Sequence, residues 1–101
     1  LMGITPRTDA NGGASVMPTI DAINERFAPL ADGRRIRYLN INGQLARADG
    51  VPREGATVDG LHLSVAGYQV WADALKPIFT ELLGPLGAED HAPLPTGDPS
   101  R

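Results

Sequence analysis

The chain has 101 residues, of which 42% are hydrophobic and 21% charged, and these proportions are typical of one ordinary globular domain. Its formal net charge is -3, and no run of Lys or Arg is dense enough to bind nucleic acid. Cysteine is absent, which excludes disulfides, thiolate metal ligands and cysteine nucleophiles together. Because no apolar run approaches the roughly 18 residues that cross a bilayer, we expect no membrane span.

The first predicted elements are a short strand and a helix. The apolar run LMGIT, residues 1–5, predicts a strand that ends at Pro6, and the Asn, Asp and Gly content of residues 8–15 predicts a loop. Apolar residues recur at helical spacing from about residue 18 to residue 30, which predicts a helix. Gly33 then suits the left-handed backbone position that follows a helix.

A second strand and a second helix are predicted further along the chain. The segment IRYLNI at residues 36–41 predicts a strand, and residues 43–58 predict a long loop, with a helical turn over residues 44–48 as the alternative. Apolar residues at helical spacing after Ser64, a candidate N-cap, predict a helix to about residue 82. Pro77 is expected to kink this helix or to divide it in two.

The order of strand, helix, strand, loop and helix is typical of consecutive units in an α/β sheet with right-handed crossovers. Two strands alone would leave their edges unpaired, because a parallel sheet buries both of its faces. We therefore expect residues 1–84 to form the C-terminal part of a larger α/β domain with a parallel sheet. Residues 85–101 are rich in Pro and Gly without periodicity, which predicts an extended tail.

Two ionisable residues, Asp59 and His62, stand three apart just before the last predicted helix. A histidine that acts as a general base needs a carboxylate on its other ring nitrogen, which fixes its tautomer and orientation. Gly60 lets the backbone turn tightly, so the carboxylate can fold back toward the imidazole. Asp-Gly is also a common turn pair, and a histidine near a helix N-terminus is often only a surface residue, so both interpretations stay open.

Four further residues have two interpretations each. Arg7 follows the first strand, at the end where α/β sheets bind ligands, so it either contacts substrate or pairs with a loop. Tyr68 and Trp71 lie on the apolar stripe of the last helix and are expected to face the core rather than a ligand. Asn24 either hydrogen-bonds to the loop around Asp59 or is exposed.

We expect no metal site. Asp59 and His62 provide two ligands, whereas a zinc site takes at least three from the protein. The other histidine, His91, lies in the predicted tail without a visible partner.

The stretch DGLHLSVAGYQVWADALKP resembles the C-terminal block of the SGNH hydrolases, the GDSL-like lipase and acylhydrolase family, in which an Asp-x-x-His pair completes a Ser-His-Asp triad. LMGITPR is similar to the penultimate core strand of that family, PTIDAINERFAPLA to the helix after it, and IRYLNINGQL to the last strand. The resemblance therefore covers residues 1–84.

The resemblance implies a flavodoxin-like three-layer α/β/α fold and an esterase that works through an acyl-serine intermediate without a cofactor. His62 would be the general base and Asp59 its orienting carboxylate, and the small ester substrate would be an acyl ester such as an acetylated carbohydrate. The Gly-Asp-Ser block and the oxyanion-hole blocks of the family are absent from these residues, and Ser15, Ser64 and Ser100 do not replace them.

The absence of a nucleophile block implies a partner. It would be the missing N-terminal part of the same domain, in another chain or segment, and the isolated chain is expected to be inactive. A function of another class is the alternative: a non-catalytic fragment of the same fold that serves in binding or assembly. The presence of a Gly-Asp-Ser segment beside the chain would separate the two. The compartment stays open, and the family resemblance is compatible with a secreted or periplasmic location.

Overall fold

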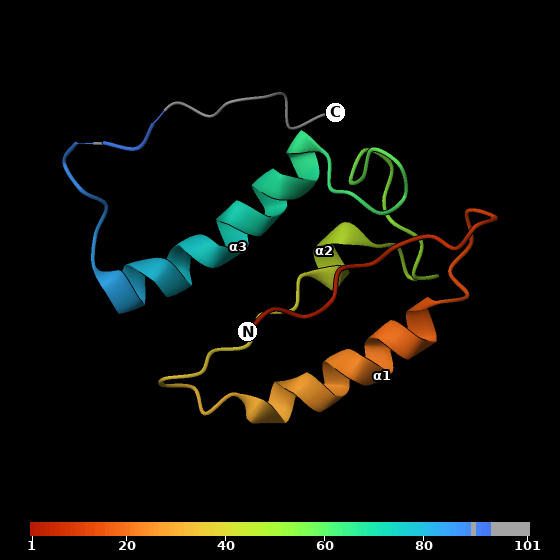
Figure 1. Cartoon of the computed structure of the whole chain (residues 1–101), viewed down its shortest axis with the longest axis horizontal. Coiled ribbons are helices and arrows are strands. Elements are labelled where there is room, and N and C mark those ends of the chain that lie inside the picture. Colours follow the sequence, from red (N-terminus) through yellow and green to blue (C-terminus); the bar gives the residue numbers. More distant parts are fainter. Residues whose placement is uncertain (90, 94–101) are drawn as a thin grey trace.

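The computed structural model describes residues 1–89 and 91–93. Its helices are α1 (Met17–Phe27), the short 3-10 helix η1 (Ala28–Leu30), α2 (Asn42–Leu45) and α3 (Val65–Leu83). Figure 1 shows the N-terminal segment and the segment that leads into α2 lying between α1 and α3. Within the described ranges α1 and α3 do not pack on each other, so each contacts the extended segments separately.

The described residues do not form the expected parallel sheet, so the predicted flavodoxin-like α/β/α fold is wrong for this structure. Within residues 1–89 and 91–93 the strand-like pairs are three isolated bridges: Met2 with Leu39 in parallel, and Ala46 with Pro52 and Thr57 with Leu63 antiparallel. The parallel bridge has two hydrogen bonds, from the Gly3 amide to the Leu39 carbonyl at 2.8 Å and from the Leu39 amide to the Leu1 carbonyl at 3.0 Å. Two short segments with no further neighbours are too few for a stable sheet, which needs about three strands or a packed face.

Helix α1 confirms the helix predicted for residues 18–30, although its last three residues form η1. Pro18 lies in the first turn, where the missing N–H of proline removes no helical hydrogen bond. The buried face of α1 carries Met17, Ile20 and Asn24. Gly33 has φ +72°, which confirms the left-handed position expected after the helix.

Helix α3 begins where the sequence indicates. The Gly67 amide donates to the Ser64 hydroxyl at 3.1 Å, which confirms Ser64 as the N-cap. The helix then runs through Pro77 to Leu83 as one element, so of the two outcomes expected for Pro77, a kink or a division into two helices, the division is excluded. A continuous helix accommodates Pro77 at the loss of one backbone donor.

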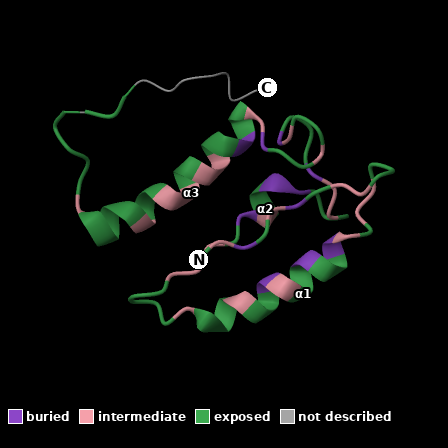
Figure 2. Ribbon diagram, in the orientation of Figure 1, coloured by how far each residue is buried: buried purple, intermediate pink, exposed green. Residues whose placement is uncertain are grey.

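The core lies under α2 and the N-terminal half of α3. Ile41, Leu45, Ala56 and Leu63 form a buried cluster, against which Trp71 packs from α3. Figure 2 shows that the buried residues gather on α2, the adjoining segments and one face of α1, whereas α3 is mostly exposed. The core therefore supports the segment that carries Asp59 and His62, which ends at buried Leu63.

Asn24 neither hydrogen-bonds to the loop around Asp59 nor is exposed, the two alternatives that the sequence left open. It is buried, and its side chain pairs with the backbone of Ile4: the Ile4 amide donates to Oδ1 at 2.7 Å, and Nδ2 donates to the Ile4 carbonyl at 2.9 Å. The Tyr38 hydroxyl donates to the Asn24 carbonyl at 3.1 Å. Asn24 thus gives Ile4 the donor and acceptor that a neighbouring strand would otherwise provide.

Residues 85–89 and 91–93 of the expected tail contain neither helix nor strand. The rest of the predicted tail, residue 90 and residues 94–101, lies outside the described residues, and Ser100 with it.

Candidate active site

The candidate site is a tight loop that we call the Asp59 loop, residues 57–63. Its two ends are held by the antiparallel bridge between Thr57 and Leu63. The Val58 amide donates to the His62 carbonyl at 2.9 Å, and the Gly60 amide donates to the Thr57 hydroxyl at 3.1 Å. The loop therefore has a fixed backbone although most of its side chains are exposed.

The Asp59 carboxylate organises this loop. Its Oδ1 accepts hydrogen bonds from the amides of His62 at 2.7 Å and Leu61 at 3.0 Å, and its Oδ2 lies 2.6 Å from His62 Nδ1. The hydrogen bond from the His62 ring, followed by those from the His62 and Leu61 amides, lowers the pKa of Asp59 from 3.8 to about 2. An ionised carboxylate can only accept hydrogen bonds, so Nδ1 carries the proton that lies between the two groups.

This proton position leaves the other ring nitrogen of His62 available. The His62 side chain is 70% exposed, and no described residue forms a hydrogen bond with its Nε2. His62 lines a cavity of about 430 Å³ together with Leu61, Leu63, Tyr68, Trp71 and residues 2–5. A neutral imidazole with Nδ1–H held by a carboxylate presents an Nε2 lone pair, which is the arrangement of a general base.

The N-terminus of α3 positions the loop from the other side. The Ser64 amide donates to the Ala56 carbonyl at 3.0 Å, and the Ser64 hydroxyl forms a short hydrogen bond with the Gly55 carbonyl. A Cβ at Gly67 would lie 2.2 Å from the Ala56 carbonyl oxygen, so only glycine allows the first turn of α3 to approach this closely. The pair Asp59 and His62 is thus fixed to the end of a helix.

Arg7 is distant from the Asp59 loop in the sequence but is next to Thr8, which contacts that loop, and no interaction in the described structure joins Arg7 to Asp59 or His62. The Thr8 amide next to it donates to the Gly60 carbonyl at 2.8 Å. The Arg7 side chain is exposed, and its Nε donates to the Thr8 carbonyl at 3.4 Å. The structure therefore gives Arg7 neither a loop carboxylate nor a defined place in the cavity.

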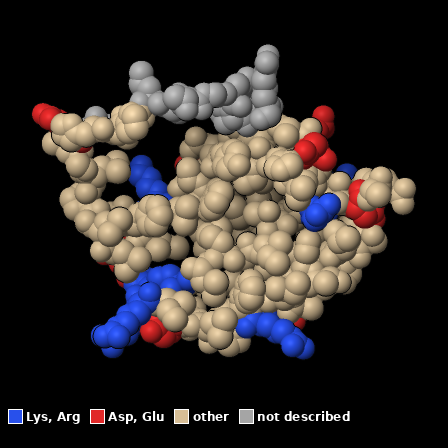
Figure 3. Space-filling model, viewed as in Figure 1, with Lys and Arg blue, Asp and Glu red and all other residues tan. Residues whose placement is uncertain are grey.

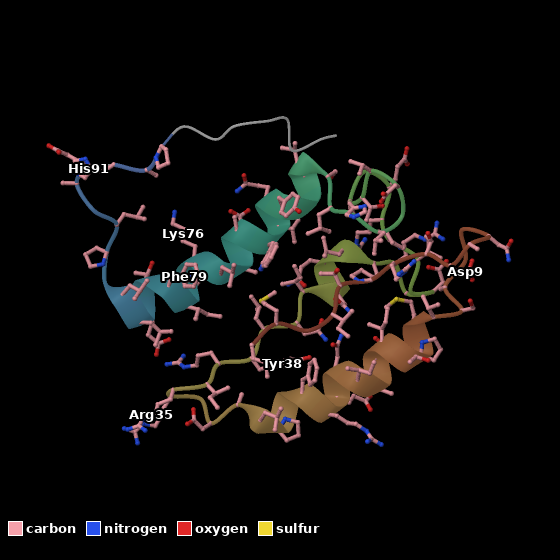
Figure 4. All side chains as sticks on the ribbon, viewed as in Figure 1. Asp9, Arg35, Tyr38, Lys76, Phe79 and His91 are labelled. Atoms are coloured by element: carbon pink, nitrogen blue, oxygen red, sulfur yellow. The ribbon has the colours of Figure 1, made fainter. Side chains whose placement is uncertain are left out.

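The two described serines are occupied elsewhere. The Ser15 hydroxyl donates to Asp9 Oδ2 at 2.5 Å, and the Ser64 hydroxyl serves as the N-cap of α3. Neither hydroxyl forms a hydrogen bond with His62. His91 is far from this site, beyond the end of α3 in Figure 4, and its Nε2 pairs with Glu89 at 3.5 Å.

Two residues that hold the loop, Thr8 and Thr57, have no counterpart in the sequence-based prediction. Thr8 contacts Gly60 across 52 positions of sequence, so no local pattern could have identified it. Thr57 forms its hydrogen bond within the turn, and a threonine two residues before Asp-Gly is a local signal of that kind.

Tyr68 and Trp71 are stacked, with ring centroids 6.0 Å apart. Trp71 is half-buried and contacts the core, as expected, whereas Tyr68 is 45% exposed beside the cavity. The prediction that Tyr68 faces the core is therefore wrong.

No group of three or more His, Cys, Asp or Glu side chains is arranged to hold a metal ion within residues 1–89 and 91–93. Over the same residues no helix is long and apolar enough to cross a membrane. Comparison of the chain with models of known protein families found no match, and comparison with curated protein sequences also found none.

Proposed function

We propose that Asp59 and His62 are the orienting carboxylate and the general base of a serine ester hydrolase whose nucleophilic serine lies outside these 101 residues. One observation carries the proposal: the contact of 2.6 Å between Asp59 Oδ2 and His62 Nδ1, with Nε2 unpartnered among the described residues. A surface histidine without this contact would have neither a fixed tautomer nor a fixed ring direction.

The proposed reaction uses that geometry. His62 Nε2 removes the proton of the serine hydroxyl while the serine oxygen attacks the ester carbonyl carbon, and the ester bond then breaks as the imidazolium returns the proton to the leaving alkoxide. Water is deprotonated by the same nitrogen in the second half and releases the acid from the acyl-serine. Asp59 stays ionised throughout and stabilises the imidazolium.

The resemblance to the SGNH hydrolases supports this chemistry, because Asp59 and His62 correspond to the Asp-x-x-His pair of that family. Only the chemistry is carried over, since the family's parallel sheet is absent from the described residues. A small acyl ester, such as the acetyl ester of a carbohydrate or another small alcohol, is the proposed substrate, on family analogy alone.

The partner required by this mechanism is a polypeptide segment that brings a serine to His62 Nε2. The engaged hydroxyls of Ser15 and Ser64 support a serine from elsewhere. The cavity beside His62, bordered by residues 2–5, offers space for such a segment. The second candidate, a non-catalytic binding or assembly module, is favoured by a different observation, the exposure of large apolar side chains along α3.

The test is covalent labelling of the native protein with a fluorophosphonate, a reagent that reacts with activated serines. The tagged 101-residue chain is isolated from its own cells together with whatever is bound or joined to it, labelled, and digested for mass spectrometry. We expect a labelled serine in a peptide that is not part of these 101 residues. In the His62→Ala variant the labelling should fall by several orders of magnitude, as removal of the general base lowers turnover about 10⁶-fold in a serine protease.

His91→Ala is the matched control, because His91 also pairs with a carboxylate, in Glu89, but lies far from the Asp59 loop. This variant should label as the unchanged chain does. Equal labelling of the His62→Ala variant would remove His62 from the mechanism. Complete absence of a labelled serine in the native material would favour the binding or assembly function.

A further inference from the structure

Helix α3 has an apolar face that the described structure covers incompletely. Of its 19 residues only Gly67 is buried, although a helix with an apolar stripe normally buries that stripe. Phe79 is 53% exposed and Leu82 is 49% exposed. Among the helices of the described residues, α3 contacts the four-residue α2 and no other.

The uncovered face forms one side of two cavities that share Met2 and Trp71. The first is the cavity of about 430 Å³ beside His62, and the second, of about 380 Å³, extends along the C-terminal half of α3. We call the two together the α3 groove. Its walls are Leu1, Met2 and Leu39 on one side and Trp71, Leu75 and Ile78 on the other.

The backbone of Met2 identifies what the groove can bind. In the parallel bridge Leu39 bonds to Leu1 and Gly3, so the amide and carbonyl of Met2 point away from Leu39. Neither group forms a hydrogen bond with any residue of the described chain. An alkyl chain has no hydrogen-bonding groups to offer, and a helix uses its own internally. An extended peptide presents one free donor and one free acceptor on each edge for every two residues.

One end of the groove carries positive charge. Arg35 and Arg37 line the second cavity, and Arg37 forms a bidentate pair with Glu81 of α3 at 2.8 and 2.9 Å. Arg35 forms no ion pair with the described residues. Figure 4 places Arg35 and Phe79 at the same end of the molecule, and Figure 3 shows Lys and Arg side chains gathered there.

We propose that the α3 groove binds an extended, mainly apolar peptide segment of a partner polypeptide, with an acidic residue at the Arg35 end. Residues Tyr68 to Leu82 of a helix rise about 21 Å, which an extended chain covers in about six or seven residues. The segment bonds to the Met2 backbone on one edge and places alternate side chains against α3. His62 also lines the first cavity, but the contacts proposed here, with the Met2 backbone, α3 and Arg35, form whether or not His62 acts as a base.

Trp71 makes the binding measurable. It is the single tryptophan of the sequence and lines both cavities, so its fluorescence reports water leaving the groove. The full chain is titrated with the capped peptide Glu-Val-Thr-Val-Ile-Val-Thr, which has no aromatic residue. We expect a saturable blue shift of the Trp71 emission.

Backbone N-methylation separates strand pairing from general apolar adsorption. Two versions of the peptide are made, and in each of them the amides along one edge are N-methylated while those of the other edge are left unchanged. Only the edge that faces Met2 needs its amide. The version methylated on the opposite edge should therefore bind as the parent peptide does. The version methylated on the edge that faces Met2 should bind at least about fivefold more weakly, because one ordinary hydrogen bond is lost. Equal binding of both versions, or no saturable shift with the parent, would overturn the proposal.

Variants of the chain test the two walls and the charge. Ile78→Ser should weaken binding about tenfold, the effect of removing a buried aliphatic side chain, while Val65→Ser, on the same helix but outside the groove, should not change it. Replacing the peptide Glu with Gln should weaken binding up to about fivefold, and Arg35→Ala should abolish that difference. Saturation of the groove by sodium decanoate with the same shift, or dimerisation that buries Trp71 in the absence of peptide, would assign the face to another occupant and contradict the proposal.

Discussion

The amide of Thr8 donates a hydrogen bond of 2.8 Å to the carbonyl of Gly60, which joins the end of the N-terminal segment to the turn between Asp59 and His62. Gly60 has φ +82°, and a Cβ there would lie 2.2 Å from the Thr8 hydroxyl oxygen. Gly60, one of the two residues between Asp59 and His62, is thus restricted to glycine for two reasons, its backbone conformation and a neighbour 52 positions away.

Gly60→Ala should therefore lower the free energy of unfolding by about 2 to 4 kcal/mol, through the left-handed backbone conformation and the contact with Thr8 together. Gly33→Ala is the matched control, because Gly33 has φ +72° with nothing within 4 Å of the added Cβ. It should cost only the conformational part, about 1 to 2 kcal/mol. Urea denaturation followed by circular dichroism gives both values, and equal losses would show that the contact with Thr8 has no effect.

Asp59→Asn should invert the tautomer of His62. In the unchanged chain the ionised carboxylate accepts the proton of Nδ1, whereas the side-chain amide of asparagine can donate to Nδ1 and so favours the tautomer with the proton on Nε2. Two-bond ¹⁵N–¹H correlation spectra at mildly alkaline pH distinguish the tautomers directly. In the proposed esterase the same change should lower turnover by about 10⁴, the loss found in a serine protease.

Glu89→Gln provides the control for that spectrum, because it changes the carboxylate beside His91 and leaves Asp59 in place. The His62 signals should be unaffected. If the unchanged chain already has the proton on Nε2, the assignment of His62 as a base held by Asp59 is wrong.

Local signals in the sequence predicted the helices well. The apolar spacing of α1 and the Ser64 cap of α3 depend on residues within one or two turns, so their positions could be inferred without tertiary structure. The strands could not, because a strand is stable only when another strand hydrogen-bonds to it. Residues 1–5 and 36–41 have the composition of strands but share a single bridge, and Asn24 occupies the backbone groups of Ile4.

The candidate site also combines a local contact that the sequence predicted with long-range contacts that it did not. The contact of Asp59 with His62 spans three residues, and the Asp-Gly turn between them made it predictable from spacing. The anchors of the loop were not predictable: Thr8 reaches Gly60 from the other end of the chain, and the approach of Gly67 to Ala56 depends on how α3 docks. The sequence left open whether the Arg7 side chain contacts substrate or pairs with a loop. In the structure it forms no contact with the Asp59 carboxylate.

Asn24→Ala should destabilise the chain by about 2 to 4 kcal/mol, because two hydrogen bonds to the Ile4 backbone are lost in a partly buried place. Thermal and urea unfolding of the variant measure this loss. Asn11→Ala is the control, since Asn11 is exposed and its side chain forms no hydrogen bond that the described structure contains. A difference of less than about 0.5 kcal/mol between the two variants would mean that water replaces Asn24 at Ile4.

Stability should also fall in acid, and the two carboxyl groups whose pKa values are lowered most, Asp9 and Asp59, contribute to this fall. The pKa of Asp9 is lowered from 3.8 to about 2, first by the Ser15 hydroxyl and then by the Gly13 and Asn11 amides, and the pKa of Asp59 is lowered to about 2 by His62 and Leu61. A carboxyl group whose pKa is lower in the folded chain stabilises it fully above the ordinary value, and that stabilisation is lost as the pH falls through the folded value. The melting temperature should therefore decline from about pH 4 to pH 2.

The Asp9→Asn and Asp59→Asn variants measure how much of this decline each of these two carboxyl groups contributes. Each removes one carboxyl group with a lowered pKa, so each should melt at a lower temperature near neutral pH and lose less on going to pH 2. In the Asp9→Asn variant the Asp59 loop is unchanged, and its His62 tautomer should remain that of the unchanged chain. A melting temperature that is constant from about pH 4 to pH 2 would mean that neither carboxylate is held by its hydrogen bonds in solution.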